Sequence, residues 1–360
     1  MKHYLLLFIV LFFFACKNDA GDRVENDKKI GFYQNDNWSV RIASGLGNIT
    51  YADNDKIHIW SQSPVLDIEF TADSTPFTVT FHLHNMMSTT MLYEDDLGTS
   101  ITKVSSDNKT QVFDVTLLNA SARITAASPD QNSAGEFSFA LVSDIQDAVY
   151  KVDDIWDSIN SYPEISFVVS TGDLTHRGTT EQMDVFFSKL ELLEKPFYST
   201  AGNHDVGWDR EEVWARRFGR VNFSFVYRHC YFTFIDSASA GIHPDVYSWL
   251  DTWLENGKNS VHTVITHYPP VDPDGTRNAS FSSRMEAWKF LKMLAKANVD
   301  LTLYGHIHSY YAFQNAGIDA YISGGGGGID EHYDGMGRHW LRITIDANEG
   351  IKSVDLIRVD

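Results

Sequence analysis

The sequence ISFVVSTGDLTHRGTTEQMDVFFSKLELLEKPFYSTAGNHD occupies residues 165–205 and contains two apolar runs that each stop at polar residues. The first run, 165–169, stops shortly before Asp173, and the second, 197–200, stops shortly before Asn203. In an open α/β sheet, the loops at the carboxyl ends of parallel strands meet in one crevice. We therefore expect Asp173 and Asn203 to lie near each other, as the ligands of a metal site would.

On both sides of this stretch, residues 136–360 alternate apolar runs with amphipathic segments, which predicts an α/β domain of two layered sheets flanked by helices. In residues 180–193, for example, Met183, Phe186 and Leu190 fall at helical spacing. The expected strands are 137–142, 165–169, 197–200, 223–236, 261–266, 301–304, 320–323, 340–345 and 351–359, and the expected helices are 152–161, 180–193, 244–255 and 282–297.

The preceding region, residues 31–127, has a different pattern. Short runs of alternating apolar and polar residues are separated by clusters of Asp, Asn, Gly, Ser and Thr; they include 56–60, 65–70, 77–83 and 111–118. This pattern predicts antiparallel strands, and its length suggests a small all-β sandwich. We expect the polar residues 128–135 to form a linker between the two domains.

The first sixteen residues resemble an export signal. Lys2 gives a positive start, residues 4–14 are apolar, and Ala15 is a small residue before Cys16. The pattern resembles a bacterial lipoprotein signal with Cys16 as the lipidation site; a plain cleaved signal and an uncleaved anchor are the alternatives. We expect an exported protein with a lipid anchor at the cell envelope, on the periplasmic or cell-surface side. Residues 17–30 then form a flexible, solvated tether.

Charge and cysteine content exclude some classes of protein. There are 29 basic and 48 acidic residues, and the net charge is −19, so a stable nucleic-acid partner is not expected. Bound metal ions can still attract a phosphorylated substrate to an acidic protein. The other cysteine, Cys230, lies in a strand-like run, and we expect it to be a buried small apolar residue.

Side chains that commonly bind metals follow five of the apolar strands. They occur in Asp144-Ile145-Gln146, Gly172-Asp173, Gly202-Asn203-His204-Asp205, Thr266-His267 and Gly305-His306-Ile307-His308. Each segment alone is typical of an ordinary turn or a satisfied polar residue. Five of them in this order, each at a strand end, indicate one shared site.

With these motifs, residues 136–360 resemble the calcineurin-like metallophosphoesterases, which include purple acid phosphatases, cyclic-nucleotide phosphodiesterases and protein serine/threonine phosphatases. The resemblance implies a four-layer α/β/β/α sandwich, here preceded by the small all-β domain, with two divalent ions (Mn, Fe, Zn or Mg). It implies that Asp144, Gln146 and His308 bind one ion, that Asn203, His267 and His306 bind the other, and that Asp173 bridges them. It also implies that His204 stabilises the transition state and protonates the leaving oxygen.

The implied reaction is hydrolysis of a small phosphomonoester or phosphodiester by a hydroxide shared between the two ions, without a covalent phospho-enzyme. The alternative is a binding or scaffold protein of the cell envelope that keeps this fold and has lost turnover. Retention of His204 beside the metal ligands argues against that alternative.

Two positions depart from the family pattern. Gln146 stands where the family usually has histidine, and a carboxamide is a weaker, harder ligand, so the first ion should be bound more loosely or be Mn or Mg. His176 stands where relatives have Asp or Tyr. It is an extra ligand, a partner of His204, a phosphate contact or a purely structural residue. Arg177 is either a phosphate contact or part of a surface ion pair.

Several neighbours of the motifs have less defined expected roles. Glycines at 324–328 would let the backbone approach the site without taking part in catalysis. Trp208, Tyr268 and Tyr310 line the substrate pocket or pack in the core. The β domain is a carbohydrate-binding or spacer module, or a lid over the pocket.

Overall fold

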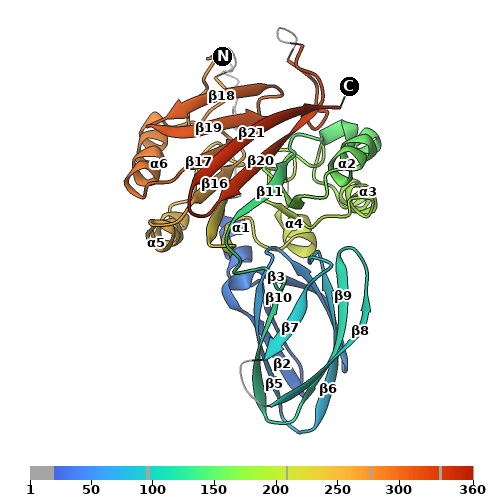
Figure 1. Cartoon of the computed structure of the whole chain (residues 1–360). Helices are drawn as coiled ribbons and strands as arrows, with labels where there is room; N and C mark the ends of the chain where they lie inside the picture. The colour runs from blue at the N-terminus through green and yellow to red at the C-terminus, as the bar shows by residue number, and fades with distance from the viewer. Residues whose placement is uncertain (1–19, 95–97, 208–209, 276–277, 332–334, 360) are drawn as a thin grey trace, which may run out of the picture.

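A computed structural model describes residues 20–94, 98–207, 210–275, 278–331 and 335–359. The signal-like segment with Cys16, and Trp208, lie outside the described residues. Figure 1 shows a wide α/β part and a narrower part made of strands, joined at a waist where α1 (Ala20–Asp27) lies. Among the described helices, none combines the length and the apolar character needed to cross a membrane.

Two sheets form the centre of the α/β part. In spatial order, the first holds β13 (Phe197–Ser199), β12 (Ile165–Ser170), β11 (Glu136–Leu141), β20 (His339–Asp346) and β21 (Gly350–Arg358). The second holds β14 (Phe223–Tyr227), β15 (Cys230–Ile235), β16 (His262–Thr266), β17 (Leu301–Tyr304), β19 (Ile318–Ser323) and β18 (Tyr310–Asn315). The helices are α2 (Asp153–Asn160), α3 (Thr180–Leu190), α4 (Glu211–Arg217), α5 (Val246–Gly257) and α6 (Arg284–Lys296), with a short 3-10 turn, η2 (Gln146–Lys151).

The alternation of side chains along β12 shows how the layers are held together. Val168 packs in the core shared with α2 and α3, whereas Phe167 and Val169 pack in the core between the two sheets. On the far side, Leu250 of α5 and Phe290 of α6 share a third core with strands of the second sheet. The four-layer α/β/β/α sandwich is therefore confirmed (Figure 1).

The strand expected over 223–236 is a hairpin. Its turn consists of Arg228 and His229, which both have positive φ, 48° and 65°, and β14 pairs with β15 on either side of it. The sequence gives no Gly or Asn at this turn, so the usual hairpin signal is missing. Cys230 begins β15 and is a free, fully buried thiol, as expected.

The second part is a sandwich of two five-stranded sheets. One holds β1 (Phe32–Gln34), β2 (Trp38–Ile42), β5 (Leu66–Ala72), β10 (Ser121–Ala127) and β7 (Met91–Glu94); the other holds β3 (Gly47–Ala52), β4 (Lys56–Ser61), β6 (Phe77–His84), β9 (Thr110–Leu117) and β8 (Thr99–Ser106), with a 3-10 turn η1 (Ala43–Gly45) between β2 and β3. Phe70 and Phe81 meet in the core between the sheets. The other described strand pairs of this part are antiparallel, as expected, but β4 and β6 pair in parallel.

The two parts are joined by amide side chains that bond to backbone groups. The Asn85 carboxamide donates to the Phe197 carbonyl at 2.8 Å and accepts from its N–H at 2.7 Å. Gln62 pairs in the same two-way manner with the backbone of Arg220, with both distances 2.7 Å. Trp60 packs edge-on against Phe187, with ring centroids 5.0 Å apart. These contacts fix the β sandwich to the start of β13 and to the segment after α4, away from the carboxyl ends of the strands.

The tether expected over residues 17–30 is a docked helix in its described part. Arg23 of α1 is buried and donates to Asp236 at 2.7 Å, to Ser239 at 2.9 Å and to Glu211 at 3.4 Å. At the end of the helix, the buried carboxylate of Asp27 accepts from the backbone N–H of Val221 and of Asn222. The tether prediction was therefore wrong, because a polar-looking segment is held by buried ionic partners and not by an apolar stripe.

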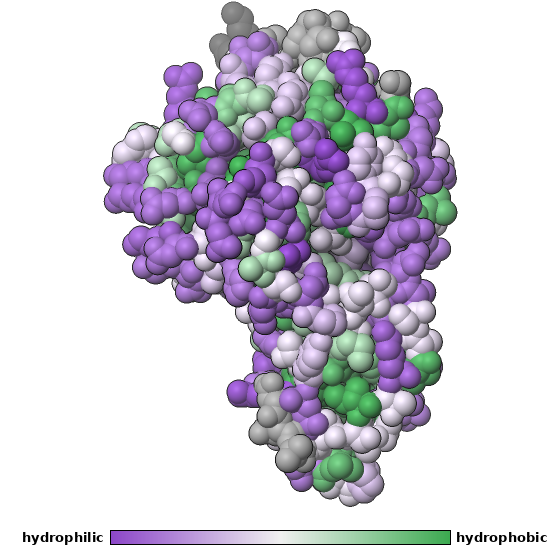
Figure 2. All heavy atoms as spheres, in the orientation of Figure 1, coloured by the Kyte–Doolittle hydropathy of each residue, from purple (hydrophilic) through white to green (hydrophobic). Residues whose placement is uncertain are grey.

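Hydrophilic side chains cover most of the α/β part on the face drawn in Figure 2, which also has small apolar patches. This distribution agrees with the large excess of acidic over basic residues.

We predict that Arg23→Ala lowers the free energy of unfolding by about 3–5 kcal/mol, because it leaves two buried carboxylates without a cation. Urea denaturation followed by circular dichroism measures this change. Arg123→Ala is the matched control, since Arg123 pairs with Glu69 on the surface, where their side chains are 71% and 50% exposed. Loss of that pair should cost less than about 1 kcal/mol. Equal effects of the two substitutions would contradict a stabilising role for docked α1.

Candidate metal centre

The five motifs come together at the carboxyl ends of β11, β12, β13, β16 and β17. Pairing of β11 with β12, β12 with β13, and β16 with β17 is parallel, so the loops that follow these strands point to the same edge. Asp144, Asp173 and His306 have positive φ values of 61°, 56° and 67°. Non-glycine residues adopt this conformation at an energetic cost, and such strain concentrates at functional sites.

The first group of ligand atoms comes from Asp144, Asp173 and His308, and these atoms lie within 4.8 Å of one another. The Gln146 carboxamide joins this group, because its nitrogen lies 3.1 Å from Asp173 Oδ2 and 3.1 Å from His308 Nε2. A flip of the amide would turn its oxygen toward the same two atoms. The Gln146 side chain therefore lies within reach of a cation held by this group, and its role as a ligand stays a prediction.

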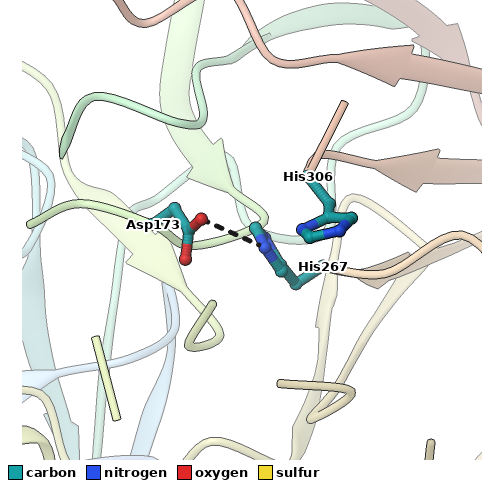
Figure 3. Close-up of side chains that lie close together, drawn as sticks. All are labelled: Asp173, His267 and His306. Atoms are coloured by element: carbon teal, nitrogen blue, oxygen red, sulfur yellow. Dashed lines mark ion pairs between the residues drawn. The ribbon is translucent and has the colours of Figure 1, made fainter. Parts of the chain in front are cut away.

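The second group comes from Asp173, His267 and His306, again with ligand atoms within 4.8 Å (Figure 3). His267 Nε2 lies 3.3 Å from Asp173 Oδ2. Asn203 belongs here too, since its Oδ1 lies 3.0 Å from His267 Nε2 and 3.1 Å from His306 Nδ1. The Asp173 carboxylate is common to both groups, which is the position required of a bridging ligand.

Hydrogen bonds outside the groups fix the tautomers of two histidines. The Nδ1 of His267 lies 3.1 Å from the Thr171 carbonyl, and the Nδ1 of His308 lies 2.7 Å from the Ile329 carbonyl. A carbonyl only accepts, so each Nδ1 carries a proton, and each Nε2 faces the ligand group, where it can bind a metal ion once the ring is neutral. Carboxylate, carboxamide and imidazole donors arranged in this way fit two divalent cations.

In the metal-free protein, the buried acid and base at the centre form an ion pair. Burial opposes charge on His267, but the nearby Asp173 carboxylate outweighs it and raises the His267 pKa to about 9. Burial likewise opposes charge on Asp173, yet its pKa is lowered, chiefly by His267. Since only neutral imidazole binds a metal ion, metal uptake must displace the His267 proton.

His204 lies beside the centre and faces a hollow. Its backbone N–H donates to Asp173 Oδ1 at 2.8 Å, and its ring Nδ1–H donates to the His176 carbonyl at 2.8 Å. These bonds leave Nε2 as the nitrogen available for proton transfer. A hollow of about 420 Å³ adjoins the ring; it is lined by His176, Arg177, Asn203, His204, Val206 and Arg210.

The side chain of His176 belongs to neither ligand group. Its Nδ1 lies 3.4 Å from Asp147 Oδ2, and its ring centroid lies 5.3 Å from that of His204. The sequence left several roles open for His176. One of them, contact with His204, is made by its backbone carbonyl, which accepts the hydrogen bond from His204 Nδ1. Arg177 is exposed beside the hollow, and Arg210, which the motifs did not single out, lines it as well.

Asp205 is a positioning residue whose role was not foreseen. Its buried carboxylate accepts from the backbone N–H groups of Leu174, Thr175 and Gly202, at 3.2, 3.0 and 3.1 Å. Burial, together with the Asp173 charge, raises the Asp205 pKa to about 6. These bonds tie the loop after β12 to the loop after β13. Its position directly after His204 in the sequence could have indicated this role.

The glycine run and Tyr268 support the ligands from outside. Gly326 N–H donates to the Ser143 carbonyl at 2.8 Å, and Gly328 N–H donates to the Asp144 carbonyl at 2.7 Å. A Cβ on Gly326 would lie only 2.4 Å from the Ser143 oxygen, so the approach requires glycine. The centroid of the Tyr268 ring lies 3.7 Å from the centroid of the His306 ring. Tyr310 is half-buried near Tyr321 and does not line the hollow.

Comparison with known proteins agrees with this geometry. A family model described as calcineurin-like phosphoesterase matches residues 137–310. These residues form a calcineurin-like phosphoesterase domain. Members of that family use a dinuclear divalent metal centre, and the two groups that share Asp173 fit such a centre.

Two curated relatives match part of this chain. A 3′,5′-cyclic-nucleotide phosphodiesterase of Nostoc sp. is 25% identical over 163 residues, which are 43% of this chain and 60% of that protein. A probable glycerophosphodiester phosphodiesterase of Arcobacter nitrofigilis is 27% identical over 153 residues, 39% of this chain and 54% of that protein. The matches therefore span between half and two thirds of the length of these relatives.

Among solved structures, a purple acid phosphatase from yellow lupin seeds has a TM-score of 0.52 and 12% identity, over 82% of this chain and 72% of that one. At this identity the match shows the fold alone. Because the phosphoesterase family model covers about half of this chain, the likeness of fold extends beyond the matched residues.

We predict that Asp173→Asn loses both metal ions, because the substitution removes the negative charge of the carboxylate that the two groups share. His176→Ala should keep both ions and the orientation of His204, since the backbone carbonyl remains. Metal analysis after dialysis against chelator-free buffer measures the ions per chain. Two ions retained by Asp173→Asn, or one lost by His176→Ala, would contradict the geometry described above.

Proposed function

We propose that this protein hydrolyses small phosphoric esters at the centre around Asp173. The observation that carries the proposal is the shared Asp173 carboxylate, with ligand groups on both sides and His204 bonded to it through the backbone. When bound, two divalent ions supply Lewis-acid activation of a phosphoryl group and of the attacking water.

The residues of the chain supply the remaining steps. Water gives up a proton to solvent and attacks phosphorus, and the bond from phosphorus to the leaving oxygen breaks. That oxygen takes the Nε2 proton of the His204 imidazolium, which solvent then replaces. The hydrogen bond from His204 Nδ1 to the His176 carbonyl holds the ring so that Nε2 faces the hollow. Asp205 keeps the loops of Asp173 and His204 at a fixed separation.

The substrate we propose is a small phosphodiester or phosphomonoester. The hollow beside His204 holds two guanidinium groups, Arg177 and Arg210, which match phosphate oxygens and other anionic groups. The names of the two relatives, for cyclic nucleotides and for glycerophosphodiesters, support a small diester. A long polynucleotide fits poorly with the strongly acidic composition.

The alternative proposal is a protein that binds metal or ligand without turnover. Gln146 in place of histidine favours it, because a weakly held first ion would slow catalysis. His204 argues against it, since a scaffold needs no oriented proton donor.

We predict hydrolysis of 4-nitrophenyl phosphate or bis(4-nitrophenyl) phosphate in at least one of Mn, Zn, Fe and Mg. His204→Ala should lower kcat by about 10²–10⁴-fold for an alkyl ester, whose alkoxide needs a proton to leave. The loss should be smaller for the 4-nitrophenyl ester, because 4-nitrophenolate leaves without protonation.

His229→Ala is the matched control, since His229 is exposed and bonds to the Asn132 carbonyl at 3.0 Å. Its kcat should equal that of the unsubstituted protein. Metal bound without hydrolysis in any of the four metals would reject the hydrolase and favour the scaffold. Equal losses for both esters would remove His204 as the proton donor.

We further propose that the protein is exported and anchored at the cell envelope through a lipid on Cys16. The support is the sequence of the first sixteen residues, with Lys2, an apolar run and Ala15 before Cys16. We predict that cells supplied with radiolabelled palmitate label the protein, and that Cys16→Ser abolishes the label and moves the protein to the soluble fraction. Equal labelling of both forms would contradict the anchor.

A further inference from the structure

Three histidines gather on the outward face of the β sandwich, on strands β4 and β6 (β6 is labelled in Figure 1). The parallel pairing sets His58 opposite His82, and His84 follows two residues later on the same strand. Their neighbours Ile59 and Leu83 point inward and are fully buried, whereas the three histidines are half-buried. The cluster is separate from the ligand groups around Asp173.

His58 is close to both of the other histidines, whereas the ring centroids of His82 and His84 lie 6.4 Å apart. His58 Nδ1 lies 3.0 Å from His84 Nε2. The His58 ring stacks on that of His82, with centroids 4.2 Å apart and an interplanar angle of 3°. Two imidazoles that bind one zinc ion tetrahedrally at 2.0–2.1 Å have nitrogens about 3.3 Å apart, so a small separation of the His58 and His84 rings would admit one cation between them.

The His84 ring is oriented by a neighbour outside the cluster. Its Nδ1 lies 3.3 Å from Thr110 Oγ1, on the adjacent strand β9. When Nδ1–H donates to this hydroxyl, the lone pair of Nε2 faces His58. A second-sphere hydrogen bond of this kind is typical of metal-binding histidines.

Burial favours the neutral form of the three rings. It lowers the pKa of His58 and of His82, and it lowers the pKa of His84 to about 4. Neutral imidazole is the form that binds metal.

We propose that His58, His82 and His84 form a second metal site, in the β sandwich, for a divalent transition ion that prefers nitrogen ligands, such as Zn, Cu or Ni. His58 and His84 supply the first two ligands close to their present positions. His82 joins after its ring turns out of the stack with His58. Water or another small ligand completes the coordination.

The test uses the full chain and zinc at pH 7.5, with the number of ions bound per chain as the readout. The Asp173→Asn protein has lost the centre around Asp173 but keeps the histidine cluster, so it should bind one zinc ion. The same protein with His58→Ala and His84→Ala should bind none, whereas addition of His229→Ala, the control, should leave one. Without the Asp173 substitution, His58→Ala and His84→Ala should reduce binding from three ions to two and leave phosphatase activity unchanged.

A second readout needs no substitution in the cluster. Cu(II) added at one equivalent to Asp173→Asn should broaden the NMR ring signals of His58, His82 and His84 and leave that of His229 sharp. A cluster held together only by a hydrogen bond and a ring stack predicts equal zinc binding with and without His58 and His84, and no selective broadening. Either result would overturn the proposal, and neither depends on whether the chain hydrolyses phosphoric esters.

Discussion

The site depends on one buried carboxylate that two sets of ligands share. Asp173 is almost completely buried, in a left-handed backbone conformation, and is within reach of His267 on one side and Gln146 on the other. A negative charge in such a place is unfavourable unless cations compensate it. Protonated His267 provides this compensation in the metal-free protein, and two metal ions would provide more. Burial makes the negative charge on Asp173 unfavourable unless cations are near, and for the same reason it favours the binding of cations to this carboxylate.

The loops around this carboxylate are held by backbone hydrogen bonds as much as by packing. Asp205 bonds to backbone N–H groups of the loop of Asp173 and of the loop of Asn203. The glycines at 326 and 328 lie so close to the carbonyls of Ser143 and Asp144 that a Cβ there would crowd them. Because these supports use main-chain groups, the ligand positions tolerate changes in side chains nearby.

The sequence predicted the layers and the gathering of the candidate ligands, because each candidate follows an apolar run that forms a buried strand. It failed where a contact joins residues far apart in the chain. Helix α1 has one buried aliphatic side chain larger than alanine, Val24, and the partners of Arg23 lie near residues 211 and 236. The parallel register of His58 and His82 likewise depends on sheet pairing. His176 was ambiguous because its hydrogen bond to His204 is made by its backbone carbonyl, which a sequence pattern does not reveal.

The docked helix α1 also bears on where the protein can work. Cys16 precedes Ala20 by four peptide units, which span at most about 14 Å when fully extended. A lipid on Cys16 would therefore keep the waist of the molecule against the headgroups, with little freedom to swing outward. Esters released from or carried by the bilayer surface would then reach the metal centre at a far higher local concentration than esters dissolved in the surrounding fluid.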